Sequence, residues 1–229
     1  MSADRREFLT AAAGGALLLG CSRSSTGAAE PAAGVAGVDD EVTPAEDLMR
    51  EHGVLRRVMY LYDDAAQRFE AQSQVPLDAL AGCAGIIRRV IEDYHEKLEE
   101  DFLFPRYEQA GVLADLTAVL RRQHQVGREL TAQIAALAVA RLADADRAKL
   151  AAALRRFNHM YRPHAAREDT VLFPALRGLV GKQRYQELGE QFEDKEKAML
   201  GDHGFEHAVA EVAGLERTFG LDDLAKLTA

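Results

Sequence analysis

Apolar side chains recur at alternating steps of three and four residues along most of the chain after residue 42, which predicts amphipathic helices. The first helix opens with a capping box, Thr43-Pro44-Ala45-Glu46, that has proline at the first helical position. It is predicted to extend to about Ala71. The periodicity predicts three more long helices: from after Pro76 to near Pro105, over about 116–134 beyond a turn at Gly111, and from about Asp146 to Phe173.

Short connections between these four helices predict an antiparallel up-down four-helix bundle over residues 43–178. Two further amphipathic segments, Lys182–Leu200 and Phe205–Phe219, predict a C-terminal helical cap over residues 179–229. Trp is absent, Pro numbers only 6, and Ala, Leu, Glu and Arg dominate, which favours helices over strands. The predicted fold class is therefore all-α.

One histidine interrupts the apolar face of each predicted long helix: His52, His95, His124 and His164. A single core-facing histidine is usually satisfied by a hydroxyl or carbonyl group and indicates no site by itself. Four of them, one on each helix, predict a shared site. The other three histidines fit less well, because His159 points away from the core stripe and glycines weaken the helix around His203 and His207.

The stretches 95–105 and 164–174 repeat one pattern, His-x3-Glu followed by Leu-Phe-Pro. Four residues turn a helix through about 400°, so the histidine and glutamate of each copy lie about 40° apart on one face. The neighbouring acids Glu96 and Glu100 lie about 100° and 140° from His95 and are expected to point elsewhere. The spacing therefore selects Glu99 and Glu168, the fourth residue after each histidine, as the second donor of each copy.

Four imidazoles and two carboxylates form the predicted inward set: His52, His95, Glu99, His124, His164 and Glu168. Uncompensated carboxylates in a core cost several kcal/mol, so two of them require positive charge nearby. Two divalent or trivalent metal ions would supply it. Imidazole and carboxylate suit iron, with manganese and zinc as competitors. If both carboxylates bridge, each ion has four protein donors and retains open positions for a bridging oxygen and an external ligand.

Charge and hydropathy exclude two other classes of protein. Lys and Arg number 28 and Asp and Glu 37, a net charge of −9, and the basic residues are scattered, so no nucleic-acid partner is expected. The 229 residues, 48% of them hydrophobic, suffice for one sizeable core. No apolar run of 18 residues predicts a membrane-spanning helix.

Residues 1–21 have the order of a targeting segment, with two arginines, a short apolar run and Leu18-Leu19-Gly20-Cys21. Arg5-Arg6-Glu7-Phe8-Leu9 resembles a twin-arginine export signal, and the last four residues resemble a bacterial lipoprotein cleavage box. The resemblance implies an exported, periplasmic or cell-surface protein anchored to a membrane through lipidated Cys21. Residues 22–42, rich in Ser, Gly, Ala and Pro, predict a flexible linker. Cys83 is predicted to be a small buried residue.

The order His, His-x3-Glu, His, His-x3-Glu on successive helices resembles the hemerythrin-like family over about residues 44–174. The resemblance implies a non-haem diiron site with the four inward histidines as terminal ligands and Glu99 and Glu168 as bridging carboxylates. One departure concerns the third helix. Oxygen-carrying hemerythrins have a second histidine four residues after the first, whereas this chain has Arg128 after His124. Members with this reduced ligand set are associated with oxygen or redox sensing, nitric oxide chemistry and iron handling.

The expected function is binding of oxygen, or of a related small ligand such as nitric oxide or peroxide, in sensing, storage or stress protection. A diiron peroxidase or oxidase is the enzymatic alternative. It requires a proton donor and a redox partner, and the sequence identifies neither. An iron-storage module and a metal-free interaction bundle are the remaining alternatives.

Overall fold

The computed structural model describes residues 42–139 and 142–228, and within these ranges it contains helices and no strand, which confirms the all-α prediction. The α-helices are α1 (Pro44–Glu70), α2 (Leu77–Ile86), α3 (Glu96–Leu98), α4 (Phe104–Ala110), α5 (Ala114–Leu137), α6 (Asp144–Arg167), α7 (Phe173–Val180), α8 (Lys182–Leu200) and α9 (Gly204–Phe219). Three π-helical segments, η1 (Ile87–His95), η2 (Glu99–Leu103) and η3 (Glu168–Leu172), and a final 3-10 turn, η4 (Leu224–Thr228), complete the described chain.

The predicted start of α1 is confirmed in detail. The Thr43 hydroxyl accepts a bond from the Glu46 backbone N–H at 3.3 Å, and the Glu46 carboxylate accepts one from the Thr43 backbone N–H at 3.0 Å. This reciprocal pair satisfies two backbone donors that the first helical turn leaves without partners.

The prediction that the second long helix ends near Pro105 is wrong. Helical structure continues without a break from Leu77 to Ala110 (the second rod) and ends at Gly111, whose φ of 66° suits glycine. Likewise, Asp144–Val180 form one rod (the fourth rod) through α6, η3 and α7. Pro105 is accommodated because it occupies the start of α4, directly after the wider π-helical turn of η2.

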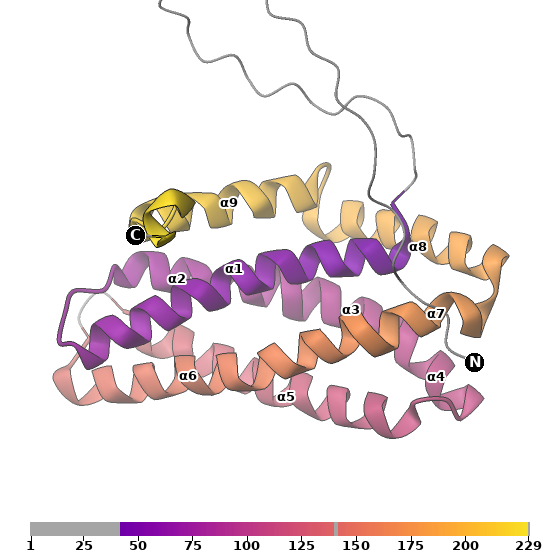
Figure 1. Ribbon diagram of the computed structural model, residues 1–229, viewed down its shortest axis with the longest axis horizontal. Coiled ribbons are helices and arrows are strands. Elements are labelled where there is room, and N and C mark those ends of the chain that lie inside the picture. The colour runs from indigo at the N-terminus through magenta and orange to yellow at the C-terminus, as the bar shows by residue number, and fades with distance from the viewer. Residues whose placement is uncertain (1–41, 140–141, 229) are drawn as a thin grey trace, which may run out of the picture. The chain divides into compact units, whose positions relative to one another are not determined.

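Four long helical rods, α1, the second rod, α5 and the fourth rod, pack side by side, with α1 and α5 both lying against α6 (Figure 1). Helices α8 and α9 lie along α1, and α9 also contacts α2. The two predicted C-terminal helices are therefore present and cover part of the bundle.

Two apolar clusters fill the interior, and each rod contributes to both. On α1, Leu48 belongs to one cluster and residues from Val54 onward to the other. On α5, Leu120 belongs to the same cluster as Leu48, and Leu130 belongs to the same cluster as Val54. The four inward histidines fall at or next to these divisions on their rods. A buried polar layer therefore separates the two apolar clusters.

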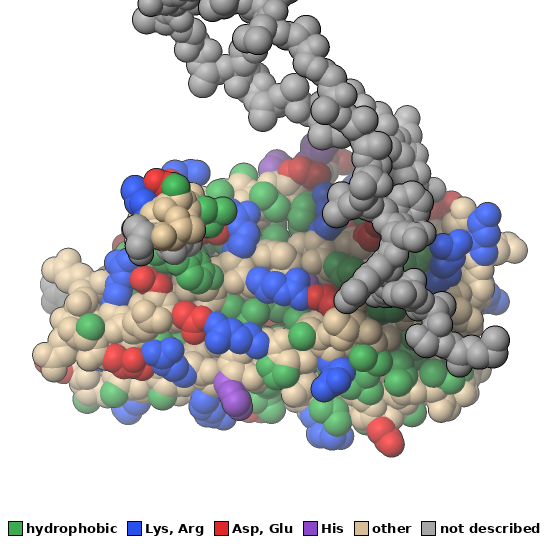
Figure 2. All heavy atoms as spheres, viewed as in Figure 1, with side chains coloured by type: hydrophobic (Ala, Val, Ile, Leu, Met, Phe, Trp, Pro, Cys, Tyr) green, Lys and Arg blue, Asp and Glu red, His purple; other side chains and the backbone are tan. Residues whose placement is uncertain are grey.

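The remaining predictions divide between the described and undescribed parts of the chain. Cys83 is a fully buried free cysteine, as predicted. No helix of the described residues is both long and apolar enough to cross a membrane. On the face in Figure 2, Lys and Arg side chains are interspersed with acidic and apolar ones. The export signal, Cys21 and nearly all of the linker lie outside the described residues.

Candidate metal centre

The six predicted donors lie in the polar layer and are almost completely buried. His164 is the most accessible, at 3% exposure, and both glutamates are at 0%. The structure thus brings together all six residues: His52, His95, Glu99, His124, His164 and Glu168. Their role as metal ligands stays a prediction.

Each glutamate lies between two histidines. Glu99 Oε2 is 3.3 Å from His124 Nε2 and 3.7 Å from His95 Nε2. Glu168 Oε1 is 3.1 Å from His164 Nε2, and Glu168 Oε2 is 3.4 Å from His52 Nε2. All four imidazoles therefore direct Nε2 toward the carboxylates.

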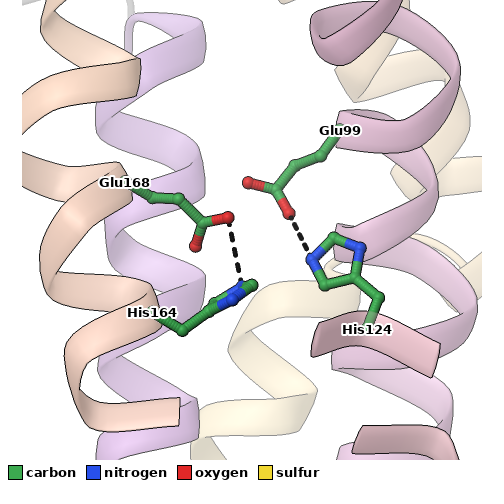
Figure 3. A group of neighbouring side chains, drawn as sticks. All are labelled: Glu99, His124, His164 and Glu168. Atoms are coloured by element: carbon green, nitrogen blue, oxygen red, sulfur yellow. Dashed lines mark ion pairs between the residues drawn. The ribbon is translucent and has the colours of Figure 1, made fainter. Parts of the chain in front are cut away.

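The histidines form two pairs. The ring centroids of His52 and His95 are 4.6 Å apart, and those of His124 and His164 are 5.0 Å apart. Around the second pair, one donor atom from each of Glu99, His124, His164 and Glu168 lies within 4.8 Å of the other three. Figure 3 shows the two carboxylates pointing toward each other across this group. The arrangement defines two positions, the 52/95 position and the 124/164 position, which share Glu99 and Glu168.

Several of these donor atoms are buried without a hydrogen-bond partner: both oxygens of Glu99 and of Glu168, and Nε2 of His95 and His124. A buried polar atom left unpaired costs roughly 1–3 kcal/mol, and more when it carries charge. Six such atoms within one cluster are explained if a cation completes their coordination. The residues present therefore fit metal ions of the kind that bind imidazole and carboxylate.

Comparison with known proteins agrees with this geometry. A family model described as the hemerythrin HHE cation binding domain matches residues 43–176, more than half of the chain. The chain belongs to the hemerythrin HHE family. A second, overlapping match covers residues 115–212. The predicted resemblance is thereby confirmed, and with it membership of a cation-binding family.

Relatives of this hemerythrin HHE protein occur in mycobacteria. Uncharacterized proteins of Mycobacterium tuberculosis (strain H37Rv) and Mycobacterium bovis are each 43% identical over 230 residues, covering 98% of this chain and 90% of the relative. No solved structure matches the chain significantly.

The HHE donors are held in place by hydrogen bonds that the sequence analysis missed. Each imidazole uses Nδ1, the nitrogen facing away from the centre, to contact an oxygen. His52 contacts Asp169 at 2.7 Å, His95 contacts Glu51 at 2.6 Å, His124 contacts Glu100 at 3.1 Å and His164 contacts Gln123 at 2.9 Å. Such bonds fix the tautomer and the orientation of a ligating histidine.

A regularity in the sequence identifies all four partners. Glu51 and Gln123 precede His52 and His124, while Glu100 and Asp169 follow Glu99 and Glu168, and each contacts the histidine of another rod. As the helical angles predict, Glu100 does not join His95 on its face. Its carboxylate supports His124 on another rod, which the spacing within one helix does not predict.

Both π-helical segments at the repeated motif begin at the inward glutamate. The backbone N–H of Phe104 bonds to the Glu99 carbonyl, and that of Phe173 to the Glu168 carbonyl, five residues back in each case. The proline that follows each phenylalanine has no N–H to continue the usual ladder. The repeated Leu-Phe-Pro therefore coincides with the same local distortion beside each carboxylate, a common location for π-helical turns.

Arg128 occupies the position where the resemblance leads one to expect a fifth histidine. Its guanidinium lies 2.7 Å from Glu96 Oε2 and 2.7 Å from Glu100 Oε1. Glu96 also accepts a bond from the Tyr161 hydroxyl at 2.6 Å. Arg128 thus contacts the two acids that lie on either side of Glu99 in the sequence of the second rod.

Burial and neighbouring charge act differently on the two shared carboxylates. Burial raises the pKa of Glu99 well above its ordinary value, and the nearby negative Glu168 adds to this effect. Burial also opposes ionisation of Glu168, but the neighbouring His164 and His52 imidazoles outweigh it and hold its pKa well below the usual range. In the metal-free protein, Glu168 is therefore the carboxylate that carries the negative charge.

The hydrogen-bonded pairs Glu51–His95 and Asp169–His52 differ in which partner holds the proton. Burial raises the pKa of Glu51 to about 8 and holds that of His95 well below its usual value. For His52, burial works against the charged form, but the hydrogen bond to Asp169 and the nearby Glu168 carboxylate raise its pKa to about 9. A proton therefore resides on Glu51 in one pair and on His52 in the other.

The three remaining histidines are exposed. His159 lies on the outer face of α6, and His203 precedes α9. His207 and Glu211 repeat the His-x3-Glu spacing a third time, but both side chains are exposed and Glu211 forms an ion pair with Arg89. The His-x3-Glu spacing therefore brings donor atoms together only where both side chains lie on a buried face of the helix.

Proposed function

We propose that the chain binds two iron ions in the core of an antiparallel up-down four-helix bundle and takes up oxygen or a related small ligand there. The observation that carries the proposal is the convergence of six unpaired, buried donor atoms between two pairs of histidines. Four protein donors for each ion would leave coordination positions that a diatomic ligand or peroxide can occupy. Residues 43–178 form the bundle in this proposal, and residues 179–229 its cap.

The protein's own residues would control the surroundings of that ligand. Phe104 stacks on His124 with ring centroids 5.5 Å apart, and Phe173 stacks on His52 at 5.4 Å. These rings, together with the apolar clusters on both sides, exclude water from the donors. A dry, enclosed centre favours reversible binding of a neutral ligand, because proton leakage and hydrolysis are suppressed.

Metal analysis with absorption spectroscopy tests the proposal. We expect about two irons per purified chain and a near-ultraviolet and visible spectrum that changes on reduction and again on exposure to oxygen or nitric oxide. Loosely held iron with no ligand-dependent spectrum would instead assign an iron-storage module. Sustained consumption of peroxide with an electron donor would assign a peroxidase.

We further propose that the bundle is exported and lipid-anchored through Cys21. The support is the order of Arg5-Arg6, the apolar run and the cleavage box in the sequence. Replacing both arginines by lysine is expected to retain the protein in the cytoplasm, and Cys21→Ala to abolish labelling with a fatty acid. Unchanged fractionation of both variants would refute this proposal without affecting the metal centre.

A further inference from the structure

The two metal positions differ in the groups that support their histidines. At the 52/95 position both supports are carboxylates, Asp169 for His52 and Glu51 for His95. At the 124/164 position one support is the carboxylate of Glu100 and the other is the neutral amide of Gln123.

Nearby cations increase this difference. The carboxylate of Glu100 contacts Arg128 at 2.7 Å, and this arginine, only 25% exposed, compensates its charge. Lys97 also contacts Glu100, at 2.5 Å, but its side chain is 46% exposed and screened by solvent. Glu51, by contrast, is 1% exposed, and within the described residues no lysine or arginine lies within ion-pair distance of it. Asp169 is paired with Arg56, whose side chain is 45% exposed and therefore well screened by solvent. Once Glu51 releases its proton on metal binding, the supports of the 52/95 position carry more negative charge than those of the 124/164 position.

The charge of the group that accepts the Nδ1 proton affects how strongly an imidazole binds a metal. A carboxylate that accepts the Nδ1 proton raises the basicity of the ligating nitrogen, and loss of such a partner typically costs tenfold to a hundredfold in affinity. Each position has two imidazoles, one beside Glu99 and one beside Glu168, and the ring spacings of 4.6 and 5.0 Å are similar. The supports are therefore the main difference between the positions.

We propose that the two positions bind metal with unequal affinity, the 52/95 position more tightly, and that Gln123 sets the weaker affinity of the 124/164 position. This inference rests on the proposed diiron function. Gln123 is a positioning residue, since it acts on the metal only through His164. A protein of this kind loads its ions in sequence and can exchange the second while the first stays bound.

Titration of the metal-free full-length protein with cobalt(II), followed by its visible absorption and calibrated with a competing chelator, tests the inference. The wild type is expected to bind two ions in two resolved steps. Gln123→Glu should tighten the weaker step about tenfold and leave the tighter step unchanged, whereas Glu51→Gln should weaken the tighter step at least tenfold. Gln125→Glu adds the same charge on the exposed side of α5 and should change neither step.

Gln123→Met covers the case in which an added carboxylate disturbs folding. This variant keeps the approximate size of the side chain but removes the acceptor, and it should weaken only the second step. Two ions of equal affinity, a shift of the tighter step in the Gln123 variants, or an equal shift in Gln125→Glu would overturn the inference while leaving the diiron proposal intact. Binding of fewer than two cobalt ions by the wild type would instead overturn the proposed function.

Discussion

The two copies of the His-x3-Glu motif share their backbone structure from the glutamate onward but have different surroundings. Both place a histidine and a glutamate on one face, begin a π-helical turn at the glutamate and continue through Phe-Pro. However, His95 is supported by the carboxylate of Glu51, and His164 by the amide of Gln123. The repeated sequence sets the direction of the ligands, while residues on other rods set the charge of the groups that support them.

The largest expected effect distinguishes the glutamates from the histidines within each copy. Because Glu99 and Glu168 each lie between two histidines of different positions, Glu99→Ala or Glu168→Ala should remove most of both irons. His95→Ala or His164→Ala should mainly empty one position. Iron per chain is the measurement, with circular dichroism to verify that the helices persist.

His207→Ala is the matched control, because it disrupts the same spacing on the surface of α9. It should leave the iron content unchanged. Full iron retention in both glutamate variants would contradict the shared-carboxylate geometry.

The next effect is a pH dependence whose sign differs between metal-free and metal-bound protein. Burial raises the pKa of Glu51 and of Glu96 to about 8, so the folded metal-free chain keeps protons that the unfolded chain releases near pH 4.5. The stability from these groups is complete at low pH and is lost as pH rises through about 8. Burial lowers the pKa of His124 to about 4, so its contribution is lost below about pH 6.5 instead. The interval from about pH 6.5 to 8 therefore excludes His124, and His52, whose pKa is raised to about 9, contributes there with the same sign as the carboxyl groups.

Metal binding reverses this trend, because Glu51 must be ionised to accept the Nδ1 proton of a ligating His95. Loading therefore releases protons, and affinity rises with pH. The difference in Tm between loaded and metal-free protein should widen from about pH 6.5 to 8. In Glu51→Gln the Tm of the metal-free form should depend less on pH over this interval, and an unchanged slope would refute the assignment.

A third prediction concerns Tyr161, which joins the fourth rod to Glu96 in the first copy. A Cβ on Gly127 would lie 2.0 Å from the Tyr161 hydroxyl, which donates to Glu96. Gly127→Ala should therefore displace Tyr161 and destabilise the protein by about 1–3 kcal/mol, despite the better helix propensity of alanine. Thermal or denaturant unfolding measures the change.

Gly85→Ala provides the control for that substitution. Gly85 also lies in a helix, but nothing comes within 4 Å of its added Cβ. This variant should be neutral or more stable by up to about 1 kcal/mol. Equal effects of the two substitutions would indicate that Tyr161 moves without cost.

The sequence was sufficient to predict the helices and the six inward residues, because both depend on periodicity along one segment. The extension beyond Pro105 was missed because a π-helical turn relieves the proline, and periodicity in steps of three and four does not report it. The supports of the histidines were missed for another reason. Each bond joins two rods, and the rotation of one rod against another depends on side-chain packing rather than on spacing within either.

The smallest expected effect tests a bond that only one copy possesses. The Tyr107 hydroxyl donates to the Leu172 carbonyl at 2.5 Å, near the end of the second copy's π-helical turn. Tyr107→Phe removes the donor while keeping the buried ring, and it should cost about 1 kcal/mol in the free energy of unfolding. Tyr60→Phe, at a side chain on α1 that is 39% exposed, should change this free energy by less than about 0.5 kcal/mol. Iron content should be unchanged in both variants, because neither hydroxyl contacts a donor. A loss of iron in Tyr107→Phe would mean that this bond also holds Glu168 in place, and the two copies would then differ in backbone support as well as in charge.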